Sequence, residues 1–264
     1  MKLCLIVNPH AGKRRGVATA AQVQVLLRDA GIEATEIVST EPGGTRRIAA
    51  GLEVGAWDGV VVVGGDGSLF EVINGLHERT DPIPIPVGQI PVGTGNSFIK
   101  DLGVETVEEA VAPILAGATR RVDLGHFSST AGGYYFINLL GAGFVSNVAY
   151  RARKYKLLGS FAYIAGVLEE VVALRATPVV LEVDGAVIER EAIFVEICNS
   201  RFTGGNMMMA PGARIDDGLF DVVLVNRISR RTVLQLLPTI FEGRHVESPA
   251  VEVFRGAHIR FRSE

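Results

Sequence analysis

The sequence predicts an α/β domain with a doubly wound, mostly parallel sheet over residues 1–122, then a β-sandwich domain with added helices over residues 123–264. In the first part, strand-like apolar runs alternate with segments of helical spacing, which is typical of a parallel sheet covered by helices. After residue 122, short β-type segments follow one another instead. There, Asp184-Gly185 lies between two alternating runs and indicates a β-hairpin.

The first domain is expected to alternate strand and helix from its start. Val60–Val63 is a run of valines, which favours a strand buried on both faces. Leu69–Leu76 has apolar residues at 69, 72, 73 and 76, the spacing of a helix. The full set comprises strands at 3–7, 33–39, 60–63 and 83–90, and helices at 16–30, 45–55, 69–76 and 106–116.

The second domain is expected to be mainly β with two helical stretches. Its strands are predicted at 134–140, 179–183, 192–199, 219–225 and 257–262. One long helical stretch spans 145–174 and is expected to break near Gly159. A second, at 229–242, starts at a Ser N-cap and stops before Gly243.

Bulk properties predict a cytoplasmic protein that touches membranes only at their surface. No apolar run approaches the roughly 18 residues that a membrane-spanning helix needs, and Met1–Asn8 is too short for a signal peptide. The net charge of −3 gives no general attraction to nucleic acid, so we expect no nucleic-acid partner. Cys4 and Cys198 lie in apolar runs and are expected to be reduced core residues. The histidines show no metal-binding spacing.

The segment Gly64-Gly65-Asp66-Gly67-Ser68 follows the valine strand and precedes a helix. Strand, glycine turn and helix together point backbone N–H groups and a positive helix end at a phosphate. The presence of Asp66 in a phosphate-binding loop needs a separate explanation, because a carboxylate repels phosphate. It would bind Mg²⁺ or take a proton from an attacking hydroxyl; the alternative is a glycine-rich turn with an incidental acid.

Two further loops strengthen the phosphate interpretation. Pro91–Phe98 follows an apolar stretch, with Thr94 and Asn96 as polar side chains and with Gly93 and Gly95 leaving room for a ligand. The loop Asn8–Lys13 follows the first strand. Ligands bind at the carboxyl ends of strands in open α/β sheets, so these loops predict one polyphosphate site.

Motifs along most of the chain resemble the diacylglycerol kinase catalytic-domain family of bacterial lipid kinases, related to sphingosine and ceramide kinases. They are Asn8-Pro9 with Gly12-Lys13, Gly64–Ser68 with Glu71 and Asn74-Gly75-Leu76, Pro91–Asn96, Arg121–Gly125, Asn138 with Gly141–Phe144, Gly204-Gly205, Ala210-Pro211 and Ile215–Asp221. NAD kinases also carry a GGDG motif. The loop Gly93–Asn96 and the segment Asp216–Leu219 favour the lipid-kinase branch.

The resemblance implies a kinase that uses ATP and Mg²⁺, with nucleotide contacts from Asn8, Thr40, Gly64, Gly65, Asp66, Gly67, Ser68, Gly93, Thr94 and Asn96. Asp66 is the candidate base, and Glu71, one turn later, would orient it or a metal-bound water. Glu71 as a plain first-turn acid and Thr40 as an ordinary turn residue are the alternatives. Lys13 and Arg14 would add positive charge near the phosphates or belong to a solvated loop.

A structural Mg²⁺ is also implied by the resemblance, with Asp217 as its ligand beside the backbone carbonyls of Arg214 and Leu219. Carboxylate and carbonyl oxygens suit a hard cation. The alternative is a β-turn that favours Asp-Asp-Gly.

The acceptor implied by the resemblance is diacylglycerol or a related long-chain lipid at a membrane surface. Tyr150–Leu158 combines cations and tyrosines, which would sit on lipid headgroups or form a solvated helix face. Met207–Met209 would line a lipid pocket or fill the core. The alternative functions are a NAD-kinase-like enzyme with a soluble acceptor, and a nucleotide- or lipid-binding protein with impaired catalysis.

Two departures from the family pattern bear on these expectations. Gly143-Phe144 is followed by Val145-Ser146-Asn147, where the family has an acid. The sequence ends at Glu264, before the Asp-Gly-Glu turn that supplies the proposed base in bacterial relatives. Either the sequence is shortened, or Asp66 serves as the base, or catalysis is impaired. An open edge at the last strand, with Ile259 and Phe261 on one face, would favour a homodimer.

Overall fold

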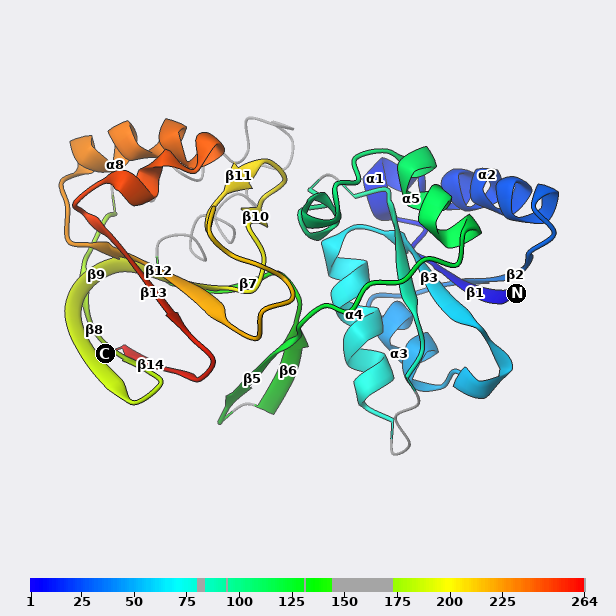
Figure 1. Ribbon diagram of the computed structural model, residues 1–264, viewed down its shortest axis with the longest axis horizontal. Coiled ribbons are helices and arrows are strands. Elements are labelled where there is room, and N and C mark those ends of the chain that lie inside the picture. The colour runs from blue at the N-terminus through cyan, green and yellow to red at the C-terminus, as the bar shows by residue number, and fades with distance from the viewer. Residues whose placement is uncertain (80–83, 94, 131, 144–172, 264) are drawn as a thin grey trace. The chain divides into compact units, whose positions relative to one another are not determined.

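The computed structural model describes residues 1–264 except 80–83, 94, 131, 144–172 and 264. The chain divides into two compact units, Met1–Ile137 and Asn138–Glu264 (Figure 1). The predicted helix at 145–174 falls almost entirely outside the described residues. The segment Tyr150–Leu158 falls wholly outside them.

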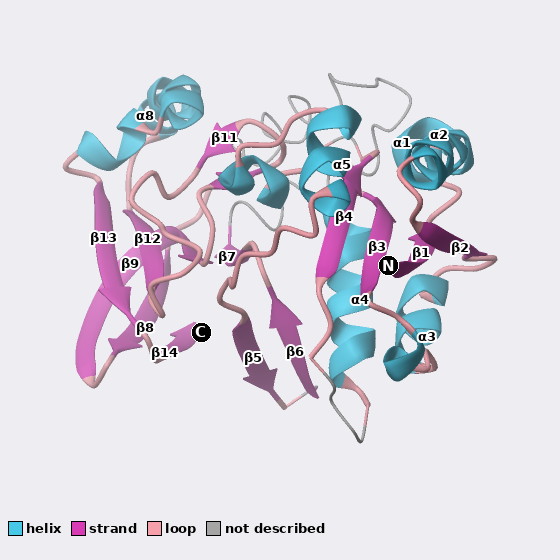
Figure 2. Cartoon of the chain, turned by 45° about the vertical axis from the view of Figure 1, so that its right-hand side comes forward, coloured by secondary structure: helices cyan, strands magenta, loops and turns pink. Residues whose placement is uncertain are grey.

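The first unit is built on a four-stranded parallel sheet of order β2-β1-β3-β4, as the sequence predicted. Figure 2 shows β2 and β4 at the two sides of this sheet. Its strands are β1 Lys2–Val7, β2 Glu33–Val38, β3 Gly59–Gly64 and β4 Val87–Pro91, followed by the hairpin β5 Gly125–Ser129 and β6 Gly132–Phe136. Its helices are α2 Gly16–Asp29, α3 Gly44–Ala50, α4 Asp66–His77 and α5 Val107–Leu115, with 3₁₀ turns η1 Val54–Ala56 and η2 Phe98–Leu102. The short segment α1 Ala11–Arg14 is an irregular turn with left-handed residues inside it.

Helices cover both faces of this sheet. Side chains of α2 and α5 pack with Val61 and Val63 of β3 in one buried cluster. Because side chains alternate along a strand, Val60 and Val62 point to the opposite face, where α3 and α4 lie. All four valines are at most 2% exposed, which confirms the strand predicted to be buried on both faces.

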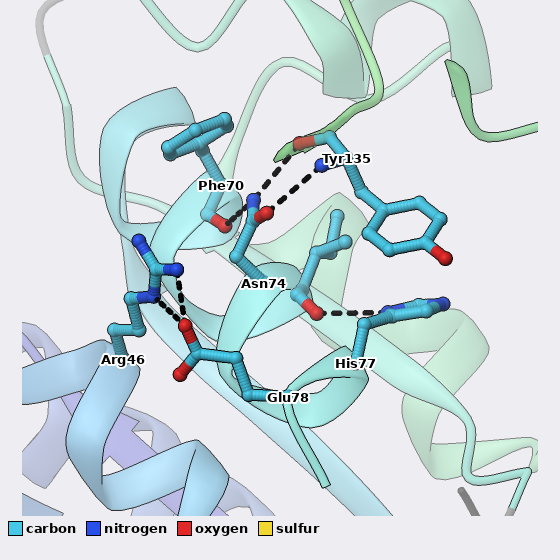
Figure 3. A network of polar contacts seen from close by, with 7 residues as sticks. Arg46, Phe70, Asn74, His77, Glu78 and Tyr135 are labelled. Atoms are coloured by element: carbon cyan, nitrogen blue, oxygen red, sulfur yellow. Dashed lines mark hydrogen bonds and ion pairs between the residues drawn. The ribbon is translucent and has the colours of Figure 1, made fainter. Parts of the chain in front are cut away.

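The hairpin β5–β6 belongs to the first unit, although the predicted domain boundary lay before it, after residue 122. Asn74 of α4 explains this placement. Its Nδ2 donates to the carbonyl of Tyr135 at 2.8 Å, and its Oδ1 accepts from the Tyr135 amide at 2.9 Å (Figure 3).

The strand predicted at 134–140 is two strands in the structure, since β6 ends at Phe136 and β7 begins at Leu139 in a different sheet.

The second unit is an antiparallel β domain with added helices, as predicted. A six-stranded sheet has the order β13-β12-β9-β8-β14, with β7 also paired to β9. Its strands are β7 Leu139–Gly143, β8 Thr177–Val183, β9 Ala186–Cys198, β12 Phe220–Asn226, β13 Val251–Gly256 and β14 Ile259–Ser263, and β10 Phe202–Thr203 pairs with β11 Met207–Met208. The helical pieces are α8 Arg230–Leu236, η4 Leu237–Glu242 and η5 Arg244–Glu247.

Two apolar layers cover opposite faces of this sheet. One contains Met207 and Met209 with residues of α8, so these methionines fill the core. The other gathers side chains from β8, β12, β13 and β14, so strands from both ends of the sheet share one core. The predicted hairpin at Asp184-Gly185 joins β8 to β9, and Ser229 caps α8 by accepting from the amide of Thr232. Both cysteines are free and buried, as expected.

Candidate active site

The carboxyl ends of β1, β3 and β4 bring the predicted glycine turns together in the first unit. Adjacent parallel strands end at the same edge of a sheet, so the loops that follow them are neighbours. The loop after β1 meets the first glycine turn through Asn8, whose Nδ2 donates to Oγ of Ser68 at 2.9 Å. The three loops predicted to bind phosphate are thus contiguous.

Glycines let these loops pack directly on one another. A Cβ added at Gly65 would come within 2.9 Å of Cα of Gly93, and one at Gly93 within 2.6 Å of Cα of Gly65. Gly12, at φ +55°, lies against the carbonyl oxygen of Val92, 2.0 Å from where its Cβ would be. The sequence predicted that Gly93 would clear space for a ligand, whereas the structure uses it for contact between the two turns.

Asp66 fastens the two glycine turns together. Its Oδ2 accepts from the amide of Ser97 at 2.8 Å and its Oδ1 from the amide of Phe98 at 3.2 Å. Both donors belong to the turn after β4, whereas Asp66 is the first residue of α4. The acid within the glycine motif therefore fixes the position of one turn relative to the other.

The first turn of α4 is open at its surface. Helix α4 begins at Asp66, earlier than the predicted start at 69, so Gly67 and Ser68 lie in its first turn. The Ser68 amide donates to the Gly65 carbonyl at 3.0 Å, so the amides of Asp66 and Gly67 are the ones left without an intrahelical acceptor, and the helix dipole makes this end positive. Gly67 is exposed, and a Cβ there would meet nothing within 4 Å. An anion can therefore approach these amides over Gly67.

The remaining predicted nucleotide and catalytic residues have different surroundings. Glu71 accepts a hydrogen bond from Oγ1 of Thr45, which ties α4 to α3. Asp66 and Glu71 thus have separate partners.

The predicted nucleotide contacts outside the glycine motif differ from one another. Thr40 is exposed just after β2, at the same edge of the sheet as the glycine turns. Asn96, at φ +50°, donates from Nδ2 to the Gly93 carbonyl at 2.9 Å and so stabilises its own turn. Thr94 lies outside the described residues.

Lys13 and Arg14 adopt left-handed backbone conformations, with φ of 61° and 72°. Residues other than glycine rarely adopt this region, and strained backbone concentrates at functional sites. Both side chains are exposed beside Gly12, which packs on the turn after β4. The loop therefore presents two cations near the glycine turns.

The other end of α4 is held by a polar network (Figure 3). Asn74 binds the Tyr135 backbone of β6 and also donates to the Phe70 carbonyl at 2.8 Å. Arg46 of α3 donates from Nε to the Glu78 carboxylate at 2.7 Å. The Asn74 contacts give the Asn-Gly-Leu motif a structural role that the sequence did not reveal. The network fixes the helix whose first turn faces the glycine loops.

The turn predicted to hold Mg²⁺, in the second unit, is already paired with a cation. Asp217 accepts from the amide of Leu219 at 3.1 Å and from the guanidinium of Arg255. The same guanidinium donates from Nε to Asp221 at 2.7 Å. Asp221 is only 3% exposed, and burial raises the pKa of its carboxyl while Arg255 opposes that rise. In this structure Arg255 compensates the charge of Asp217, so Mg²⁺ would compete with this guanidinium, and ligation of Mg²⁺ by Asp217 stays a prediction.

The second unit contains a buried acid that was not predicted from the sequence. Glu196 of β9 is 1% exposed, and neither carboxylate oxygen has a hydrogen-bond partner among the described residues. It lies between Gly141 of β7 and Val223 of β12. Burial raises its pKa to about 8, so the side chain is mostly neutral at pH 7. The signal was an acid inside the apolar run 192–199.

Comparisons with known proteins find a matching protein family for each of the two units. Residues 2–127 match the diacylglycerol kinase catalytic domain, and residues 138–264 match the YegS C-terminal NAD kinase beta sandwich-like domain. A diacylglycerol kinase of Mycobacterium tuberculosis H37Rv is 32% identical over 259 residues, covering 96% of this chain and 82% of the relative. The chain belongs to the diacylglycerol kinase family. It is therefore a kinase, as the sequence predicted.

Further relatives show the same relationship. The diacylglycerol kinase of Bacillus subtilis is 29% identical over 246 residues, covering 92% of this chain and 79% of that protein. A solved structure from Bacillus anthracis, assigned as a diacylglycerol kinase, superposes with a TM-score of 0.79 at 27% identity, covering 100% of this chain and 86% of that one. Within the described residues, no helix is long and apolar enough to span a membrane.

Proposed function

We propose that this kinase transfers the γ-phosphate of ATP to a hydroxyl group of diacylglycerol or a related long-chain lipid. The observation that carries the proposal is the fastening of two glycine turns by Asp66 beside the open first turn of α4. Phosphoryl transfer depends mainly on positioning and charge stabilisation, and rigid backbone donors supply both.

The phosphates of ATP would lie over Gly67. There the amides of Asp66 and Gly67 and the positive end of the α4 dipole would be available to an anion. Lys13 and Arg14 would add two cations from the loop after β1, and Thr40 would contact the nucleotide from the end of β2. The glycine turns themselves keep the cradle rigid, because Gly65 and Gly93 leave no space between them.

Asp66 would accept the proton of the lipid hydroxyl while it holds the second turn. An ionised carboxylate offers about four lone-pair sites, so two amide donors leave acceptor capacity for a substrate. Glu71 would act indirectly, through its hydrogen bond with Thr45 and the position of α4. Asp66 would thus combine a positioning and a catalytic role.

Magnesium would accompany the ATP phosphates and neutralise their charge. Among the described residues, no group of three or more acids, histidines or cysteines is placed to hold a metal ion by itself. Asp66 and the phosphates together would supply oxygen ligands of the kind that Mg²⁺ prefers. A second, structural Mg²⁺ at Asp217 would first have to displace Arg255.

The acceptor class comes from the relatives, which are named diacylglycerol kinases. A lipid substrate implies contact with a membrane surface, and the net charge of −3 gives no general attraction to nucleic acid. A homodimer would be compatible with this function. The molecular mass of the protein in solution would show whether it forms.

Incubation with labelled ATP and extracted lipids, followed by mass spectrometry of the product, tests the proposal. We expect label on a diacylglycerol-type lipid, and none when NAD replaces the lipid. Label on NAD without detergent or vesicles would instead assign the NAD-kinase-like function. ATP binding without transfer to any lipid would contradict the proposal.

A further inference from the structure

A cavity of about 800 Å³ lies in the first unit beside β4. This volume is in the range of sites that hold small molecules and cofactors. Leu69, Ile73 and Leu76 of α4 line one side of it, and Pro113 and Ile114 of α5 line another. The lining is mainly aliphatic, which suits a hydrocarbon chain.

The cavity is separate from the glycine turns. Residues 64–68 and 92–96 do not line it. It extends to Asp58 and Gly59 at the amino end of β3 and to Val87 at the amino end of β4. The glycine turns follow the carboxyl ends of the same strands. An occupant of the cavity would therefore not compete with phosphate at α4.

One polar side chain in this cavity has no partner. Gln89 of β4 is 8% exposed, and neither Nε2 nor Oε1 has a hydrogen-bond partner among the described residues. The register pairs Gln89 with Val62, whose side chain faces the side of the sheet covered by α4. A buried amide without partners is costly, and natural proteins rarely keep one without a reason.

An amide that both donates and accepts is complementary to an ester, an amide or a hydroxyl group. The surrounding aliphatic side chains are complementary to an acyl chain. We propose that the first unit binds one molecule of a long-chain acyl lipid with an uncharged head, its head group hydrogen-bonded to Gln89 on the α4 face and its chain passing the edge strand β4 toward α5. This site does not depend on the proposed function, because it needs neither ATP nor transfer.

Photo-crosslinking of the full chain tests this site. The probe is 1-monodecanoylglycerol with a diazirine at the end of its chain, used in solution without ATP. We expect saturable labelling of peptides that contain Leu69–Leu76 and Pro113–Val122. Labelling confined to residues 138–264 would overturn the proposal, because it would show that the probe does not bind in the first unit.

Three variants identify the contacts. Gln89→Leu keeps the volume and removes the amide, so half-saturation should need about tenfold more probe while the melting temperature stays equal or rises. Leu76→Trp fills the cavity and should abolish labelling of the first unit. Gln24→Leu, on α2 outside the cavity, is the matched control and should label like the unmodified protein.

Equal labelling of the first unit in Gln89→Leu, Leu76→Trp and the unmodified protein would overturn the site. A protein that is labelled in the first unit but phosphorylates no lipid contradicts only the proposed function.

Discussion

The two units treat a buried or half-buried acid in opposite ways. In the first unit, the two carboxylate oxygens of Asp66 accept hydrogen bonds from two backbone amides. Glu196 of the second unit has no partner among the described residues, and burial raises its pKa to about 8. Hydrogen bonds from the backbone stabilise a charged acid, whereas an apolar layer favours the neutral form. The first acid positions loops for chemistry, and the second carries a stability cost that depends on pH.

The largest effect is expected for Asp66→Asn. Turnover should fall about 100-fold or more, the range for loss of a general base. The structure adds a loss of stability of about 1–3 kcal/mol, because an Asn side chain cannot accept from both Ser97 and Phe98. Steady-state kinetics and thermal melting measure the two effects. The control is Asp29→Asn at the exposed end of α2, and wild-type turnover in Asp66→Asn would end the catalytic role.

Glu196→Gln should change how stability depends on pH. The folded state holds the proton up to about pH 8, whereas the unfolded chain releases it near pH 4.5. Between these values the unfolded state binds fewer protons, so stability falls as pH rises, by up to about 1.4 kcal/mol per pH unit. Below pH 4.5 the effect is absent.

Denaturant unfolding at pH 5, 6.5 and 8 measures this slope. Gln cannot ionise, so Glu196→Gln should be increasingly stable relative to the unmodified protein toward pH 8. Glu189→Gln, an exposed position of the same strand, should leave the slope unchanged. Parallel pH curves for Glu196→Gln and the unmodified protein would show that Glu196 is charged and paired.

A smaller effect is expected for Arg255→Met. Its guanidinium is partly exposed but holds the buried Asp221 together with Asp217. Removing it should destabilise the protein by about 1 kcal/mol at pH 7, between the values for exposed and buried pairs. Burial raises the pKa of Asp221 above its ordinary value of 3.8, so the destabilisation should shrink as the pH falls toward about 3, where Asp221 is mostly protonated in both states.

Thermal melting at both pH values measures it, with Arg260→Met, which loses an exposed pair with Glu182, as the control. Freeing Asp217 should also let Mg²⁺ raise the melting temperature of Arg255→Met more than that of the unmodified protein. An equal response to Mg²⁺ in the two proteins would show that Arg255 does not compensate Asp217.

The sequence was sufficient for the sheet and the location of the glycine turns. A valine run followed by glycines gives strand and turn from local pattern alone. The partners of Asp66 could not be predicted, because Ser97 and Phe98 become its neighbours only when β4 pairs with β3. The contact of Gly65 with Gly93 has the same origin. The strand expected at 134–140 was divided because an apolar pattern does not show which sheet a residue joins.

The surroundings of Glu196 and Asp217 in the second unit also could not be predicted from the sequence. Glu196 lies in a strand that reads as apolar, and only the tertiary fold shows that Gly141 faces it. The pairing of Arg255 with Asp217 joins β13 to a turn distant in the sequence. Sequence patterns therefore predicted where the glycine turns lie, but not the partners of these acids in the second unit.

The central claim is that phosphate binds over Gly67 at the first turn of α4, and ATP affinity of Gly67→Ala tests it most directly. A methyl group there has free space in the unliganded protein, so the melting temperature should stay equal or rise slightly. The same methyl group would occupy the space of the phosphate, and calorimetry should show ATP binding about tenfold weaker, or about 1.4 kcal/mol. Unchanged ATP affinity in a stably folded Gly67→Ala would contradict the account.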